Sequence, residues 1–328
     1  METILNDQEP LFEEIVEGVD AVSTAKPFIG ANTIESSLEE IKSRHVIPVF
    51  IKDNEPTISH SDFIDVTRDV ISEIYPLETI LKPAVRLSHP IKGRVPSAKD
   101  KPAKELLEAE KTLYFERMAF IVEIASVYDE IDGQRLSLVV GGVKSYSLDN
   151  LYNKKGSDEH FKVFIGFKNS VCTNLCVSTD GYMGNLKVNS IGQLRAGIRT
   201  LIEGYNASFN IHTLRELNDY CLTESQFAHL VGRCRMYNHL PNGSKSKVTP
   251  LLLSDTQLGM VVKDFYRDNS FCRDSAGNIN LWRLFNLFTS ANKSSYIDTF
   301  LDRSVNAFQF THELKMVLDN KSTSWYLN

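Results

Sequence analysis

The sequence has no apolar run long enough to cross a bilayer. Its apolar stretches, such as LSLVVGG at residues 136–142, fall far short of the roughly 20 residues that a membrane-spanning helix requires. The first 20 residues carry acids where a secretory signal would have a basic start and an apolar core. We therefore expect a cytoplasmic protein that does not bind a membrane.

Cysteine is scarce as well. The 328 residues contain five cysteines, an odd number, which is typical of reduced thiols and not of a disulfide framework. Cys172 and Cys176 lack a second pair at the spacing of a zinc ribbon, and no two histidines stand four residues apart, as in a zinc-binding helix. We predict no metal site and no cofactor.

No diagnostic catalytic motif is present. Residues 141–145, GGVKS, lack the upstream glycine of a phosphate-binding loop and lie in a strand-like run, where Gly141 and Gly142 favour a β-bulge. The serine-hydrolase elbow and the kinase motifs are missing too. A non-enzymatic protein is expected, and the alternative is an active site assembled by folding, such as His160 with Cys172 or Cys176.

What the sequence does have is an uneven distribution of charge. Residues 1–80 hold 5 Lys or Arg and 17 Asp or Glu, a net charge of −12, whereas residues 81–328 hold 31 and 25, a net charge of +6. Such asymmetry indicates an acidic segment that folds over a basic surface, or one that only keeps the chain in solution. We treat residues 1–80 as an acidic N-terminal region.

A basic connector follows at residues 81–104, with LSHPIKGRVPSA at its centre (residues 87–98). Four prolines in the connector exclude the helix that a phosphate-binding loop must lead into. We expect an extended strap whose cations bind either phosphates or the acidic region of the same chain.

The remaining pattern predicts an α+β fold, in which an antiparallel β-sheet (a hairpin plus further strands) packs with helices and a helical C-terminal region follows. Residues 105–210 form the predicted α+β core and residues 211–328 the helical region. The hairpin turns at Asp132-Gly133. Helices are predicted over residues 33–44, 60–75, 102–117, 190–209, 211–221, 222–240 and 280–291, with one broken helix or two adjacent helices over 294–320.

Cations and tyrosines are the candidate binding residues, because nucleic acid needs positive charge for its phosphates and stacking surfaces for its bases. Aromatic and basic residues also interleave later in the chain, for example in KDFYRDNSFCR and ANKSSY. The predicted phosphate contacts are Arg86, His89, Lys92, Arg94, Lys99 and Lys101, with Lys144, Lys154 and Lys155 as helpers and Tyr146 and Tyr152 as stacking groups.

Three segments, at residues 85–98, 167–188 and 280–307, resemble an uncharacterised protein family of bacterial mobile elements and phages. More distantly, Asn169, Ser170, Cys172, Asn174 and Trp282 resemble the pattern of a broader phage/plasmid-like family. The resemblance implies a mobile-element accessory protein and supplies no activity. The predicted element order over residues 117–204 is similar to that of phage single-strand annealing proteins. We therefore expect a protein that binds or anneals single-stranded DNA in recombination or replication.

Two alternatives stay open. The acidic first 80 residues could dock on a basic protein, which would make the chain an inhibitor or adaptor acting on a host defence or transfer complex. A helix-turn-helix over residues 212–237 is less favoured, because a reader helix after Gly232 would have about two turns before Pro241. The sequence leaves homo-oligomerisation open.

Overall fold

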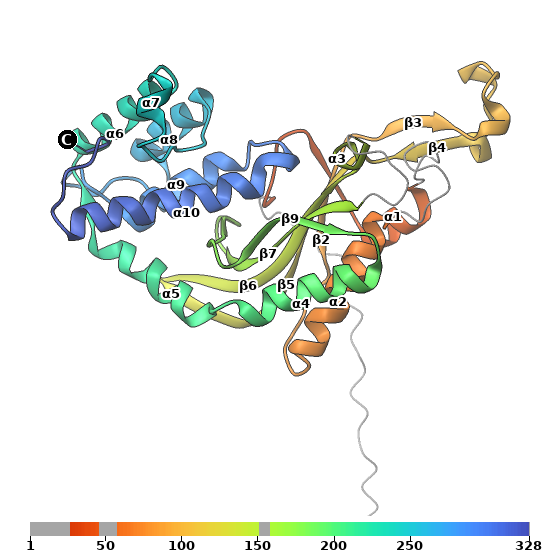
Figure 1. The fold of residues 1–328 in the computed structure, drawn as a ribbon, viewed down its shortest axis with the longest axis horizontal. Coiled ribbons are helices and arrows are strands. Elements are labelled where there is room, and N and C mark those ends of the chain that lie inside the picture. The colour runs from red at the N-terminus through yellow and green to blue at the C-terminus, as the bar shows by residue number, and fades with distance from the viewer. Residues whose placement is uncertain (1–26, 46–57, 151–157, 328) are drawn as a thin grey trace, which may run out of the picture.

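The computed structural model describes residues 27–45, 58–150 and 158–327. The fold is α+β, as predicted: a curled antiparallel sheet packs against helices, and a helical C-terminal region follows (Figure 1). The main sheet has seven strands in the order β1-β2-β5-β6-β7-β8, and β9 also pairs with β7. These strands are β1 (Thr33–Ser36), β2 (Ala84–Ser88), β5 (Arg117–Ile131), β6 (Gln134–Ser145), β7 (Glu159–Asn169), β8 (Leu175–Cys176) and β9 (Tyr182–Val188).

The predicted hairpin is confirmed as β5 and β6. Asp132 and Gly133 have φ angles of 51° and 69°, the left-handed conformation that a two-residue Asp-Gly turn requires. The pairing register shifts between Ile124 and Tyr128. The bulge of this hairpin therefore lies in β5, where the extra residues curl the sheet.

Two helices cover one face of the sheet, α2 (His60–Ile74) and α4 (Ile191–Gly204) (Figure 1). Gly142 makes room for α2, because a Cβ at this position would lie 2.4 Å from the ring of Phe63. Gly141 and Gly142 pair with β5 in regular register. The bulge predicted at these glycines is therefore wrong, since they are needed for close packing instead.

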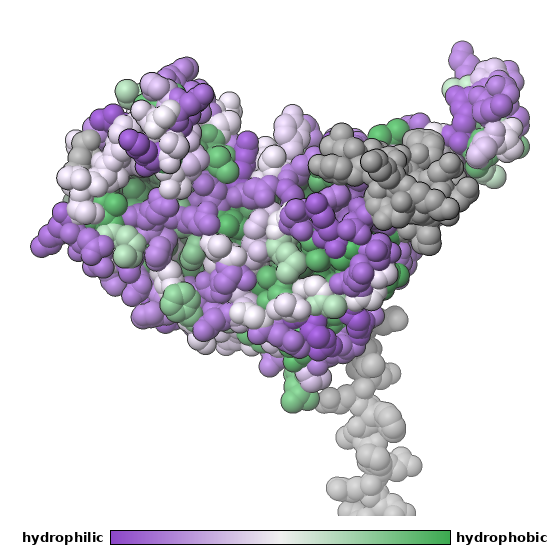
Figure 2. Space-filling model, viewed as in Figure 1, coloured by the Kyte–Doolittle hydropathy of each residue, from purple (hydrophilic) through white to green (hydrophobic). Residues whose placement is uncertain are grey.

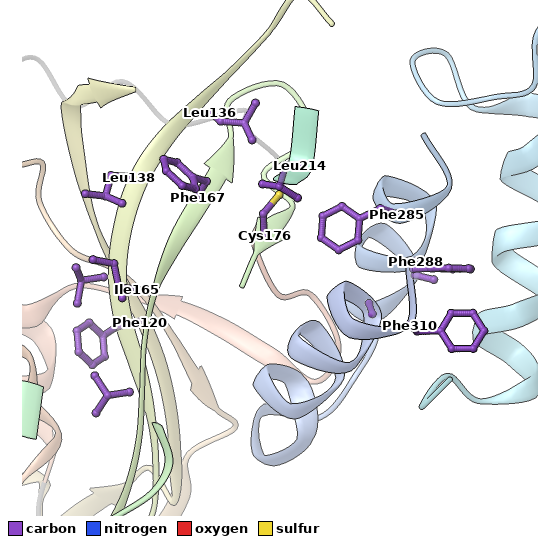
Figure 3. Close-up of a cluster of buried hydrophobic side chains, with 14 of the residues drawn as sticks. Phe120, Leu136, Leu138, Ile165, Phe167, Cys176, Leu214, Phe285, Phe288 and Phe310 are labelled. Atoms are coloured by element: carbon purple, nitrogen blue, oxygen red, sulfur yellow. The ribbon is translucent and has the colours of Figure 1, made fainter. Parts of the chain in front are cut away.

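The C-terminal helix α10 (Ile297–Asp319) packs on the opposite side of the sheet, and α9 (Leu281–Asn292) packs against α10. Residues 294–320 thus hold one continuous helix and not a broken one. Figure 3 shows the apolar cluster that joins these layers, from Phe120 and Ile165 of the sheet to Phe285 of α9 and Phe310 of α10. A second cluster joins α10 to the other face of the sheet, where Phe300 and Leu301 pack with Ile121 and Phe164.

The residues that carry the sequence resemblance join the sheet to α9. The side-chain amide of Asn174 donates to the backbone oxygen of Asn286 at 3.0 Å. Lys293 donates to the carbonyl oxygen of Cys172. Trp282 is fully buried. These side chains position a turn of the sheet on a helix.

The helix predicted over residues 102–117 is absent, and this segment forms short turns and a strand instead. The apolar residues of its first half find no core to pack against, since Leu107 is 65% exposed, whereas Phe115 near its end is buried. Most helices in proteins depend on such packing for their stability. The segment is instead built from the 3₁₀ turns Ala103–Glu105 and Glu108–Glu110 followed by β4 (Lys111–Tyr114), which pairs with β3 (Ile91–Arg94) after the turn Pro96–Ala98.

Two further differences concern helix ends. Residues 33–36 of the helix predicted at 33–44 form β1, and α1 (Leu38–Arg44) begins only after its cap Ser37. Helix α8 (Asp255–Arg267) was not predicted, although Ser254 and Gln257 form a capping box at its start. The remaining elements are α3 (Tyr146–Asn150), α5 (Ala207–Glu216), the 3₁₀ turn Leu217–Asp219, β10 (Cys221–Leu222), α6 (Glu224–Tyr237), α7 (Asn242–Lys245) and β11 (Ile279–Asn280). Within the described residues, no helix is both long and apolar enough to span a membrane.

Candidate nucleic-acid interface

Strands β3 and β4 form a two-stranded ribbon that projects from the body of the protein (Figure 1). We call residues 91–114 the arm. Lys92 pairs with Leu113, and Arg94 pairs with Lys111. Paired residues of antiparallel strands point to the same face, as do residues two apart along one strand. Lys92, Arg94 and Lys111 therefore share one face of the arm.

This face places like charges together. Arg94 and Lys111 lie directly opposite each other, an arrangement that disfavours the ribbon by itself. Intramolecular contacts relieve part of the repulsion, because Lys111 pairs with Glu108 and the guanidinium of Arg94 donates to the carbonyl oxygen of Lys101. An anion bound on this face would relieve it further.

The tip of the arm adds more cations. Lys101 forms an ion pair with Glu110. Lys92, Lys99 and Lys104 are exposed and have no ion-pair partner among the described residues. Figure 2 shows that the end of the arm is mostly hydrophilic and stands clear of the body. These ammonium groups are solvated and open to an anionic partner.

Arg86 and His89 lie below the arm in different surroundings. The Arg86 guanidinium donates to the hydroxyl of Thr33 at 3.1 Å and to its carbonyl oxygen at 3.0 Å, and lies 3.6 Å from Glu35. Burial lowers the pKa of Arg86. Arg86 thus contacts Thr33 and Glu35 of β1, the strand that pairs with its own strand β2. His89 is exposed.

The prediction for Lys144 is wrong, because this side chain is fully buried. The alternation of β6 turns it inward, onto the face of the sheet that α2 covers. Its ammonium lies 2.7 Å from a carboxylate oxygen of Glu159 and 3.2 Å from one of Asp149. It also lies 4.0 Å from the centre of the Phe161 ring. Lys144 is a structural cation held by two buried carboxylates.

The stacking role predicted for Tyr146 is also wrong. Tyr146 is fully buried, and its hydroxyl accepts a hydrogen bond from the backbone N–H of His60 at 3.1 Å. Burial raises the pKa of Tyr146 well above its ordinary value. No base can reach this ring from solvent. The other predicted residues of this stretch, Tyr152, Lys154 and Lys155, lie outside the described residues.

Tyr146 instead belongs to an aromatic cluster at the foot of the arm. We call His45, His60, Tyr114 and Tyr146 the root cluster. The ring of His45 stacks on those of His60 (4.9 Å between centroids) and Tyr114 of β4 (5.8 Å). Nδ1 of His45 accepts a hydrogen bond from the backbone N–H of Phe115 at 3.2 Å.

Both imidazoles of the root cluster are held neutral. Burial lowers the pKa of His45 to about 4. Burial also lowers the pKa of His60 well below its ordinary value, and the neighbouring His45 and Lys144 act in the same direction. The two histidines therefore pack at the foot of the arm as uncharged imidazoles.

A hollow of about 460 Å³ opens beside the foot of the arm, and we call it the root hollow. Two large apolar side chains at its rim reach into solvent, Tyr296 (66% exposed) and Ile91 (50% exposed). Arg117 is already paired, since its Nε lies 2.6 Å from Asp298 and its Nη1 3.2 Å from Glu116. The lining residues are Ala31, Asn32, Ser88, His89, Ile91, Glu116, Arg117, Tyr296 and Ile297.

Two residues of this interface were missed by sequence reasoning. Lys111 lay in a segment predicted to be helical, and only the pairing of β4 with β3 brings it beside Arg94. Tyr296 lies in the aromatic and basic stretch ANKSSY, but the pattern cannot tell an exposed ring from a buried one. A strand assignment for residues 111–114 would have identified Lys111.

The described residues contain no group of three or more His, Cys, Asp or Glu side chains that could hold a metal ion. Burial raises the pKa of both Cys172 and Cys176. A catalytic thiol needs a lowered pKa, so neither cysteine is prepared to act as a nucleophile with His160.

Part of the acidic N-terminal region pairs with cations of the same chain. Glu73 of α2 forms ion pairs with Arg195 and Arg199 of α4. Lys42 of α1 lies 2.7 Å from Asp65 of α2. The acids of these helices thus face cations of the same chain, although such exposed pairs stabilise a fold only weakly.

Comparison with known proteins identifies a family without a described activity. No curated protein and no solved structure matches the chain. The family model described as "Domain of unknown function, B. Theta Gene description (DUF3871)" matches residues 11–327. Because the match covers nearly the whole sequence, the chain belongs to this uncharacterised family.

Proposed function

We propose that this protein binds nucleic acid through the arm. The observation that carries the proposal is the shared face of Lys92, Arg94 and Lys111 on an exposed two-stranded ribbon. A ribbon of this kind fits the major groove of a duplex, and its cations can equally follow the backbone of a single strand. Lys99 and Lys104 at the tip extend the positive surface.

Binding of this kind depends on phosphates and not on base sequence. Release of counterions makes such an affinity fall steeply with salt. A protein that binds nucleic acid regardless of its sequence fits an accessory role in the recombination or replication of a mobile element or phage. That association, and the cytoplasmic location it would require, are part of the proposal.

The test is a filter-binding titration of the protein with a labelled single strand and with a duplex of the same length. If about four phosphates are neutralised, the affinity for the single strand should drop about fiftyfold between 50 and 200 mM salt. The absence of any salt-sensitive association with either probe would remove the proposal.

A charge-reversal pair gives the matching control. Lys92→Glu with Arg94→Glu should abolish most of the binding. Lys263→Glu with Arg267→Glu makes the same charge change on the exposed side of α8, at two exposed cations four residues apart. Equal loss in both double variants would show that net charge matters and the arm does not.

The protein-binding alternative stays a prediction. Residues 1–26 and 46–57, which hold much of the acidic charge, lie outside the described residues. A pulldown from host lysate with and without the first 26 residues tests it, and loss of one specific partner on truncation would favour it over the arm.

A further inference from the structure

We infer that the root hollow receives a base of a single strand, stacked on Tyr296, and so makes the protein selective for single-stranded nucleic acid. This inference rests on the proposed function, because the arm would hold the phosphates of the same strand. It also replaces Tyr146, which the fold buries, with a tyrosine that solvent reaches.

The rim of the hollow offers a stacking surface. Tyr296 is 66% exposed and Ile91, which also lines the hollow, is 50% exposed. Large apolar side chains exposed together around a concavity are typical of a binding site. Tyr296 is the residue that precedes α10, and its side chain makes no capping hydrogen bond.

The charges inside the hollow favour an uncharged ligand. The guanidinium of Arg117 is neutralised by Asp298 and Glu116, so the hollow does not present a free cation for a phosphate. Asn32, Ser88 and His89 bring donors and acceptors of hydrogen bonds to the lining. A nucleobase is flat and uncharged and has polar edges, so it fits a hollow that has no free cation and a lining that can form hydrogen bonds.

The hollow and the arm are continuous along the chain. His89 and Ile91 line the hollow, and Lys92, which follows directly, belongs to the cationic face of the arm. Successive side chains of β3 point to opposite faces, so the backbone of a nucleic-acid strand with one base in the hollow would pass round the edge of the arm to reach Lys92. The bases of a duplex are stacked inside the helix and cannot enter without being flipped out.

The experiment compares fluorescence anisotropy of a labelled oligothymidine with that of its duplex of equal length, for the full chain and three variants. Stacking contributes about 1–3 kcal/mol per base, so Tyr296→Ala should weaken binding of the single strand about 5- to 150-fold and leave duplex binding unchanged. Tyr296→Phe should keep most of the affinity. Phe209→Ala, at a ring of α5 that is 62% exposed, is the control and should bind like the unaltered chain.

The outcomes separate the two proposals. If the unaltered chain binds neither probe, both the arm and the hollow are wrong. If it binds and Tyr296→Ala is without effect, or weakens single strand and duplex equally, the arm stands and this inference is overturned. A loss in Tyr296→Phe as large as in Tyr296→Ala would point to the hydroxyl and would also overturn stacking. Thermal unfolding of Tyr296→Ala at an unchanged midpoint confirms that the variant is folded.

Discussion

The arm and the interior beside it both contain lysines, but in opposite surroundings. Lys92 and Lys99 of the arm are exposed, and Lys101 is only partly covered. Lys144 lies fully buried between Glu159 and Asp149. An ammonium in water keeps its hydration and binds an anion at little cost, whereas a buried ammonium must be compensated in full by its neighbours. The surroundings, and not the residue type, separate a solvated cation from a structural one.

The energies of the two regions should differ accordingly. Ion pairs at the surface, such as Lys101 with Glu110, contribute about 0–1 kcal/mol. Removal of one partner of a buried pair costs about 3–5 kcal/mol, because a charge is left without compensation. Variants of the interior should therefore change stability, and variants of the arm should change binding.

The largest expected effect is that of Lys144→Met. This change leaves Glu159 and Asp149 buried without their cation, so the free energy of unfolding in urea should fall by about 3–5 kcal/mol. The matched variant Lys92→Met, at an exposed site, should change it by less than about 0.5 kcal/mol. Similar losses in the two variants would refute the distinction between the regions.

A pH titration tests the root cluster, which lies between the arm and the interior. The pKa of His45 is about 4 in the folded protein and about 6.5 when the chain is unfolded, so the unfolded state binds more protons between these values. Stability is then complete above about pH 6.5 and declines, by up to about 3 kcal/mol, as the pH falls toward 4. Urea unfolding at intervals of pH measures the slope.

The variant His45→Asn is the control for that titration. It removes the imidazole, so the slope between pH 5 and 6.5 should become shallower, although His60 will retain part of it. The same slope in both proteins would mean that the root cluster does not govern the pH dependence.

Substitution of one glycine in the core and one in the arm compares the two regions again, with a smaller expected effect on stability. A Cβ at Gly142 would lie 2.4 Å from the ring of Phe63 in the core, so Gly142→Ala should cost about 1–3 kcal/mol. A Cβ at Gly93 of the arm would lie 2.7 Å from the hydroxyl of Thr112, a side chain that can rotate away. Gly93→Ala should cost less than Gly142→Ala in thermal unfolding, and the reverse order would show that the arm belongs to the cooperative core.

The smallest effect on stability should come from reversing Lys92 and Arg94 together. Binding of nucleic acid should be lost while the midpoint of thermal unfolding changes little, because both side chains are exposed. A clearly lower midpoint would mean that these cations hold the acidic region of the same chain.

Elements with a strong local pattern were predicted well. The spacing of apolar residues identified α2 and α4, and Asp132-Gly133 identified the hairpin of β5 and β6. The helix expected over residues 102–117 failed because the apolar residues of its first half, such as Leu107, have no core to face. Local propensity cannot show whether a partner surface exists.

The candidate site divides in the same way. The sequence by itself determined the α+β class, the hairpin and the basic character of the stretch that holds Lys92, Arg94 and Lys99. Only the tertiary structure decided that Lys144 and Tyr146 are buried, that Lys111 joins the cationic face, and that Tyr296 stands beside the arm. Charge and periodicity are properties of neighbouring residues in the chain, whereas burial and convergence depend on which distant strands pair and which helices cover them.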